Sequence, residues 1–257
     1  MDLDKILIFD LTGPMAHFRK FYTNSSALTY GFPPRTALMG IVAAILGYER
    51  DSYYEELDRG RFAVAVKVPT RRLIQTVNYV RTKREDLILL RRLGRVSGTQ
   101  TLLEFLVPGG EDRLLRFRLF FAHPSAALLG QAADRLKEGR PCFPLYLGIT
   151  ECLATARYVN LFKTQEFQTI APGTTVQLTS VLNVAHLELI DLPTAYAPRL
   201  VRERAPYAFG AGRMLRPSIA CIYDATGKPL SVRLRVPAYR FHLPFSEGEE
   251  TVAFLEG

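Results

Sequence analysis

The segment RTALMGIVAAILG, residues 35–47, carries apolar side chains around nearly its whole circumference and constrains the fold more than any other feature. Pro33 and Pro34 stand where a helix would begin and Gly47 stands where it would end, so the segment is predicted to be a helix. Because almost every face is apolar, this helix must be buried against a sheet. Its longest apolar run, Leu38 to Leu46, is too short to span a membrane.

Strand and helix patterns alternate over the first 139 residues. Strands are predicted at 5–11, 62–68 and 114–121, and a second, amphipathic helix is predicted at 125–139. Between the second and third of these strands, two further extended segments at 73–83 and 98–107 flank a basic, turn-rich tip. This order predicts an α+β fold, namely a ferredoxin-like (RRM/RAMP) βαββαβ domain with one greatly extended hairpin.

The second half of the chain is rich in short strands separated by Pro, Gly and Asn. They are predicted at 154–162, 174–182, 186–190, 218–224 and 230–236. We therefore expect two regions: a ferredoxin-like domain at 1–150 with its hairpin at about 75–100, and a smaller β-rich region at 151–257.

The positive charge of the chain is concentrated in the predicted hairpin. Residues 61–118 hold 13 of the 33 Lys and Arg residues but 5 of the 25 Asp and Glu residues, which accounts for the whole net charge of +8. Such a distribution indicates a polyanionic partner, although a solvated hairpin face would show the same pattern.

Few residues suggest catalysis or a cofactor. The three cysteines, at 142, 152 and 221, form no CxxC motif and fit the reducing cytoplasm. The four histidines lie far apart in sequence and no Gly-rich loop follows a strand into a helix, so neither a metal site nor a nucleotide cofactor is expected. One catalytic alternative stays open: His17 could serve as the base of a metal-independent endoribonuclease.

Two segments combine cations with aromatic rings and amides, as single-stranded nucleic-acid binding requires. The first is a polar loop, AHFRKFYTNSSALTYG at 16–31, and its candidates are His17, Arg19, Lys20, Tyr22, Asn24 and Ser25. The candidates in the second, the hairpin, are Asn78, Tyr79, Arg81, Lys83, Arg84, Arg91, Arg92 and Arg95. A basic glycine turn adds Gly210, Gly212 and Arg213, where the backbone could approach a phosphate, although a plain turn would look the same.

Several longer motifs point to a family. Phe9-Asp10 and AHFRKFYTNSSALTYGFPPRTALMGIVAAILG at 16–47 closely resemble the RAMP-superfamily subunit that caps the 5′ handle of crRNA in CRISPR-associated type I Cascade complexes. NYVRTK at 78–83, GTQTLLEFLVP at 98–108 and PLYLGITECLA at 144–154 follow in the order of that family. The resemblance covers roughly residues 5–155, and the last third is only loosely similar.

The resemblance implies a structural, non-catalytic RNA-binding subunit. It implies that the hairpin is a thumb that grips crRNA and abuts a backbone RAMP subunit, and that Arg19, Lys20, Tyr22 and Arg35 lie near the handle. The other partners it implies are the large Cascade subunit and, indirectly, target DNA, without a membrane. The chain looks most similar to the type I-B form, in which a separate endoribonuclease cuts the precursor RNA.

Overall fold

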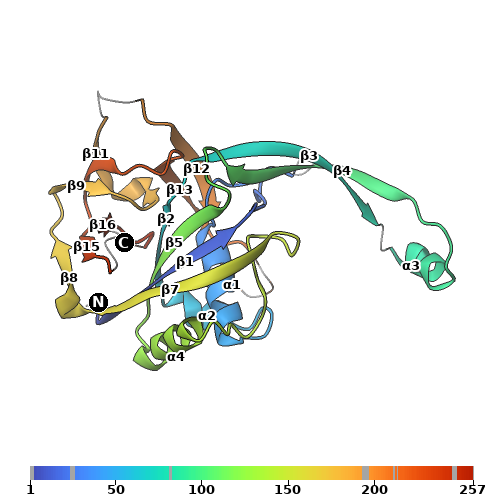
Figure 1. Ribbon diagram of the computed structural model, residues 1–257, viewed down its shortest axis with the longest axis horizontal. Coiled ribbons are helices and arrows are strands. Elements are labelled where there is room, and N and C mark those ends of the chain that lie inside the picture. The colour runs from blue at the N-terminus through green and yellow to red at the C-terminus, as the bar shows by residue number, and fades with distance from the viewer. Residues whose placement is uncertain are drawn as a thin grey trace.

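The computed structural model describes residues 3–23, 27–80, 83–192, 197–210, 212, 214–244 and 248–256. Figure 1 shows a body of sheets and helices from which one long hairpin projects. Strands greatly outnumber helices, so the fold is of the mixed α+β type, as predicted. Among the residues described, no helix has the length and apolar character needed to span a bilayer.

A five-stranded antiparallel sheet with the order β2-β5-β1-β7-β6 organises the body. Its strands are β1 (Lys5–Gly13), β2 (Arg61–Val66), β5 (Leu115–Ala122), β6 (Leu145–Tyr146) and β7 (Leu153–Lys163). The side chains of β1 alternate between two apolar cores, Leu7 and Phe9 in one, Ile6 and Ile8 in the other. Both faces of β1 are therefore buried, which explains its continuous apolar sequence.

Helices α1 (Arg35–Leu46) and α4 (Ala126–Lys137) contact each other on one face of this sheet, with the short α2 (Tyr54–Asp58) beside α1. Gly47 ends α1 in the left-handed conformation, at a φ of +88°, and its N–H donates to the Ala43 carbonyl. Ser125 begins α4, where its hydroxyl accepts from the Leu128 N–H. Both predicted helices are confirmed. The sequence predicts them because the residues that start and stop each helix lie next to it in the chain.

The predicted hairpin is present and is longer than expected. It consists of β3 (Thr70–Val80) and β4 (Gly98–Pro108), which pair with each other along their whole length. Its tip contains a helix, α3 (Arg84–Arg91), where the sequence predicted turns. Glu85 and Asp86 in the first turn of α3 favour a helix at this point, because acidic residues stabilise a helix N-terminus.

The C-terminal region forms a six-stranded sheet, β11-β14-β9-β16-β15-β8, and a three-stranded sheet, β10-β13-β12. The bounds are β8 (Phe167–Ile170), β9 (Thr175–Leu178), β10 (Leu182–Asn183), β11 (Leu187–Asp191), β12 (Leu200–Pro206), β13 (Ser218–Asp224), β14 (Leu230–Leu234), β15 (Ala238–His242) and β16 (Glu249–Val252), with 3-10 turns η1 (Thr164–Glu166) and η2 (Val184–His186). The region is β-rich, as predicted, but the first sheet runs past the predicted boundary at residue 150, because β7 is the second neighbour of β1.

Buried ion pairs join the first sheet to the C-terminal region. Arg118 on β5 donates to both carboxylate oxygens of Asp10 on β1, at 2.6 and 2.9 Å, and to Glu250 on β16, at 2.7 Å. Lys67 also donates to Glu250, at 2.6 Å. Because the Arg118, Asp10 and Glu250 side chains are all but inaccessible to water, these charges depend on one another for compensation.

Candidate nucleic-acid interface

The polar loop and the hairpin, predicted as separate binding segments, are joined at the root of the hairpin. The backbone of Ala16 exchanges hydrogen bonds of 2.9 and 2.8 Å with that of Leu106 on β4. Ala27 forms a second bridge, to Leu103, and its carbonyl accepts from the Glu104 N–H at 3.0 Å. The loop therefore meets β4 at two points, in an antiparallel bridge at Ala16 and a parallel bridge at Ala27.

Three predicted RNA ligands are buried and have polar partners within the chain. The Nδ1 of His17 donates to the Glu104 carbonyl at 2.8 Å, and the residue is 2% exposed. Lys20 is held by Glu203, with Nζ 2.8 Å from Oε1. These side chains hold the loop against the rest of the chain, because their charge or polarity is satisfied by partners far away in sequence.

Arg35 is the third buried candidate, and its side chain is 1% exposed. Its Nη1 donates to the Asp58 carboxylate at 2.6 Å, its Nη2 donates to the Asp58 carbonyl at 2.9 Å, and its Nε donates to Glu256. The guanidinium also lies 4.5 Å from the centre of the Tyr207 ring. Arg35 thus ties α1 to the C-terminal segment and presents no charge to a ligand.

The other described candidates divide into two groups that lie apart. On the body, Arg19 and Tyr22 of the loop are exposed. Along the hairpin and its tip, the exposed candidates are Asn78, Tyr79, Lys83, Arg84, Arg91, Arg92 and Arg95. Asn24, Ser25, Arg81 and Arg213 lie outside the described residues. The hairpin extends well away from the body in Figure 1, so the two groups are separated in space.

The glycine turn is a small hairpin beside helix α2. Phe209 forms an isolated bridge with Leu215, and the Gly210 N–H donates to the Met214 carbonyl at 2.8 Å. Gly210 is half-buried and Gly212 is exposed. The Phe209 ring lies 5.7 Å from that of Tyr54, so this turn belongs to the wall of the groove described next.

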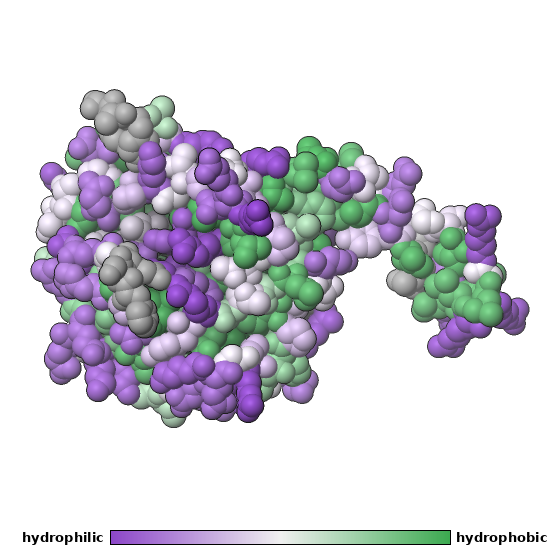
Figure 2. All heavy atoms as spheres, in the orientation of Figure 1, coloured by the Kyte–Doolittle hydropathy of each residue, from purple (hydrophilic) through white to green (hydrophobic). Residues whose placement is uncertain are grey.

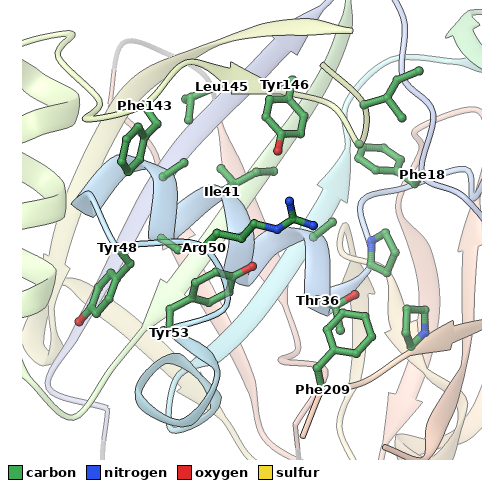
Figure 3. Close-up of a pocket in the computed structure, with 18 of the residues that line it drawn as sticks. Phe18, Thr36, Ile41, Tyr48, Arg50, Tyr53, Phe143, Leu145, Tyr146 and Phe209 are labelled. Carbon is green, nitrogen blue, oxygen red and sulfur yellow. The ribbon is translucent and has the colours of Figure 1, made fainter. Parts of the chain in front are cut away.

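A groove of about 630 Å³ runs along the outer side of α1. Figure 3 shows rings on both of its sides, Tyr53 and Phe209 on one and Phe143 and Tyr146 on the other, with Arg50 reaching between them. Small α1 residues line it, and Arg19 and Phe21 of the polar loop lie at its end. Sequence reasoning missed this site, because its rings come from separated segments and no local pattern announces it.

Sequence reasoning also missed an apolar patch at the hairpin tip, visible in green in Figure 2. The patch consists of exposed residues on and after α3, namely Leu87, Ile88, Leu89, Leu90 and Leu93. Leu93 is 97% exposed. One feature of the sequence could have predicted this patch, namely the apolar run LILL at 87–90. It lies in a segment predicted to project from the body, where the rest of the chain could not bury these side chains.

The described residues offer no metal centre: within them, no three His, Cys, Asp or Glu side chains gather in a way that could hold an ion. This surface carries exposed cations, rings that can stack and an apolar tip. Such an arrangement binds polyanions and apolar partners through charge and stacking.

Comparisons with known proteins found similar solved structures and a matching family. A search of curated proteins returned no match. A chain from a solved structure described as "CRISPR RNA-guided surveillance complex" has the same overall fold, with a TM-score of 0.50, 18% identity, and coverage of 89% of this chain and 91% of that chain. Another, described as "Crystal structure of Cas protein", gives a TM-score of 0.42 at 16% identity and covers 88% of this chain and 98% of that one.

A family model covers most of the chain. The model described as "CRISPR-associated protein (Cas_Cas5)" matches residues 6–188, well over half of the sequence. The match includes the polar loop, helix α1, the hairpin and the segment around β6, which are the segments that carried the resemblance in the sequence. The chain therefore belongs to the Cas5 family of CRISPR-associated proteins.

Proposed function

We propose that this Cas5 protein is a structural subunit of a type I effector complex, Cascade, of the I-B form. It binds the 5′ handle of crRNA and caps the backbone of RAMP subunits next to the large subunit, so that target DNA is reached through the guide. The observation that carries the proposal is the cationic hairpin whose root is hydrogen-bonded to the polar loop. The chain with a similar fold, which is part of an RNA-guided surveillance complex, agrees with it.

We also propose that the body is the ferredoxin-like βαββαβ domain of the RAMP superfamily. The order β1, α1, β2, β5, α4, β7 along the chain supports this assignment once the hairpin is set aside as an insertion. The antiparallel strand order β2-β5-β1-β7 supports it further, because the first and third strands of the motif lie in the middle. The hairpin is then an insertion between the second and third strands, which places it at one end of the sheet.

We propose that the subunit holds RNA without cutting it. The candidate base of the alternative endoribonuclease, His17, is buried with its Nδ1 bound to a carbonyl. A general base needs access to the 2′-hydroxyl that it deprotonates, and a side chain in this environment has little. Binding is instead assigned to exposed cations and rings, which act on an intact strand.

Replacing Arg91, Arg92 and Arg95 by Gln is expected to weaken binding to single-stranded repeat RNA. Each lost phosphate contact should reduce the slope of log K against log salt by about 0.7, because fewer counterions are released. Fluorescence anisotropy at several salt concentrations measures both quantities. The RNA recovered from the wild-type complex should keep its full length in EDTA.

The matched control replaces three exposed arginines of the body, Arg59, Arg140 and Arg235, by Gln. Both variants lose three positive charges, so a general effect of net charge would change them equally. Equal salt slopes for the two variants would refute the assignment of RNA contacts to the hairpin tip. Shortened RNA in EDTA would refute the non-catalytic role.

The apolar tip points to a protein partner in the same complex. Changing Leu87 and Leu90 to Ser is expected to reduce co-purification of the backbone subunit by about tenfold or more, because buried apolar anchors dominate interfaces. The same change should leave RNA binding by the free protein unaltered. Leu192→Ser, an exposed leucine of the body, is the control, and equal recovery of the partner with both variants would contradict this role.

A further inference from the structure

Two buried carboxylates meet at the root of the hairpin. Glu203, on β12 of the C-terminal region, receives Lys20 Nζ at 2.8 Å and Arg72 Nη2 at 2.6 Å on its Oε1. Its Oε2 accepts the Gly31 N–H at 3.0 Å. Only 2% of the Glu203 side chain is exposed, so these partners replace nearly all of its hydration.

Glu104, on β4, forms the second half of this charge cluster. Its Oε2 accepts the Thr29 N–H at 2.9 Å and lies 3.9 Å from Arg72 Nε. Its backbone carbonyl accepts from the His17 ring. Two cations and two carboxylates therefore balance at a point shared by the polar loop, the hairpin and β12.

Arg72 is the hairpin's side-chain link to β12 in this cluster. It lies near the start of β3, on the strand that otherwise pairs with β4. A backbone contact lies beside it: the Thr70 N–H donates to the Ala225 carbonyl at 3.0 Å, and Arg199 donates to the Thr70 carbonyl. The rest of the hairpin extends away from the body in Figure 1. Its direction therefore depends on these contacts, on the backbone bonds between β4 and the polar loop, and on the burial of Leu103, Phe105 and Leu106 in the main core.

The length of the hairpin makes its direction sensitive to the root. A strand of 11 residues such as β3 extends for about 35 Å at its usual rise per residue. A rotation of about 10° at the root therefore moves the far end of such a strand by about 6 Å. A shift of that size separates the tip cations from phosphates that the polar loop has already positioned.

We infer that Glu203 is a positioning residue that sets the direction of the hairpin relative to the polar loop, acting through Arg72. It touches no RNA in this arrangement; it holds two RNA-binding segments at one mutual angle, so that a single strand can engage both. The RNA part of the inference rests on the proposed function, whereas the geometric part does not. Lys20 and His17, which were predicted to be RNA ligands, contact Glu203 and Glu104 and so hold the polar loop at this cluster.

The experiment measures the angle of the hairpin in the free protein. Cys142 is exposed, whereas Cys152 and Cys221 are buried, and burial raises the pKa of the Cys152 thiol to about 11 and that of Cys221 to about 12. Spin labels therefore attach to Cys142 on the body and to an introduced Ser97→Cys at the hairpin tip. Double electron–electron resonance then measures the distances between the two labels. The width of the distance distribution reports how much the direction of the hairpin varies.

Arg72→Met and Glu203→Gln are both expected to broaden this distribution and to weaken RNA binding by about tenfold, because preorganisation of two linked sites is lost. Arg72→Met leaves Glu203 paired with Lys20, so it tests the hairpin even if Glu203→Gln folds poorly. The matched control is Arg71→Met, which removes the same charge one residue away on an exposed side chain.

A distribution as narrow as that of the wild type in both variants would overturn the inference. So would equal broadening by Arg71→Met, because the effect would then belong to charge alone. Broadening specific to Arg72→Met and Glu203→Gln, with no RNA binding even by the wild type, would support the positioning role and overturn the proposed function instead.

Discussion

Arg35→Ala is expected to lower the free energy of unfolding by about 3–5 kcal/mol, the usual loss when one partner of a buried ion pair is removed. The Glu256 side chain, 10% exposed, loses its counter-charge, and Asp58 loses a 2.6 Å bond. The backbone carbonyls of Asp58 and Gly60 also lose their donor, Arg35 Nη2. Urea unfolding followed by circular dichroism measures the difference.

Arg216→Ala is the matched control, because Arg216 donates to the same Asp58 carboxylate at 3.1 Å. Its side chain is 53% exposed, so its removal should change the free energy by less than about 1 kcal/mol. Adding Glu256→Gln to Arg35→Ala should recover part of the loss, since the unpaired charge is gone. Equal losses in the free energy of unfolding for the two arginine variants would show that burial of Arg35 contributes nothing to stability.

The loss should also depend on pH in a defined direction. Burial raises the pKa of the Glu256 carboxyl, and the Arg35 guanidinium opposes that shift. Without Arg35, the folded-state pKa rises further, so the folded state keeps a proton that the unfolded state releases, and stability falls as pH rises between the two values. The difference between wild type and Arg35→Ala is therefore expected to grow as the pH rises above the ordinary pKa of a glutamate, 4.5.

The elements that sequence alone predicted are those with local signals. Helix α1 has Pro34 before it and Gly47 after it, and the strands of the body are apolar runs ended by Pro or Gly. The hairpin followed from its charge and its alternation of side chains. Strands such as β12, LVRERAP, escaped prediction because charged residues interrupt them and their burial depends on partners elsewhere in the chain.

The candidate site was predicted only where exposure could be inferred. Lys20 was grouped with ligands by residue type and Arg35 by the family resemblance. Their partners Glu203 and Glu256 lie more than 180 residues away in sequence. No local pattern distinguishes a buried, paired cation from a free one. The aromatic groove along α1 was missed for the same reason, since only tertiary structure brings its rings together.

Gly148→Ala is expected to disrupt the polar loop. Gly148 adopts a φ of +95°, and a Cβ there would lie 2.0 Å from the His17 carbonyl oxygen and 2.6 Å from the carbonyl carbon. The left-handed conformation alone costs about 1–2 kcal/mol for a residue with a Cβ. The clash with backbone adds about 1–3 kcal/mol, because neither segment can move without breaking its hydrogen bonds.

Gly139→Ala separates these two contributions, since Gly139 has a φ of +65° and no neighbouring atom lies within 4 Å of the place that a Cβ would take. Both variants carry the conformational strain, but only Gly148→Ala must push His17 away, and with it the bond from the His17 N–H to the Leu147 carbonyl. Faster hydrogen exchange in residues 16–23 and weaker RNA binding should therefore accompany Gly148→Ala alone. If the two variants unfold at the same urea concentration and exchange alike, close contact between these loops does not hold Arg19 and Tyr22 in place.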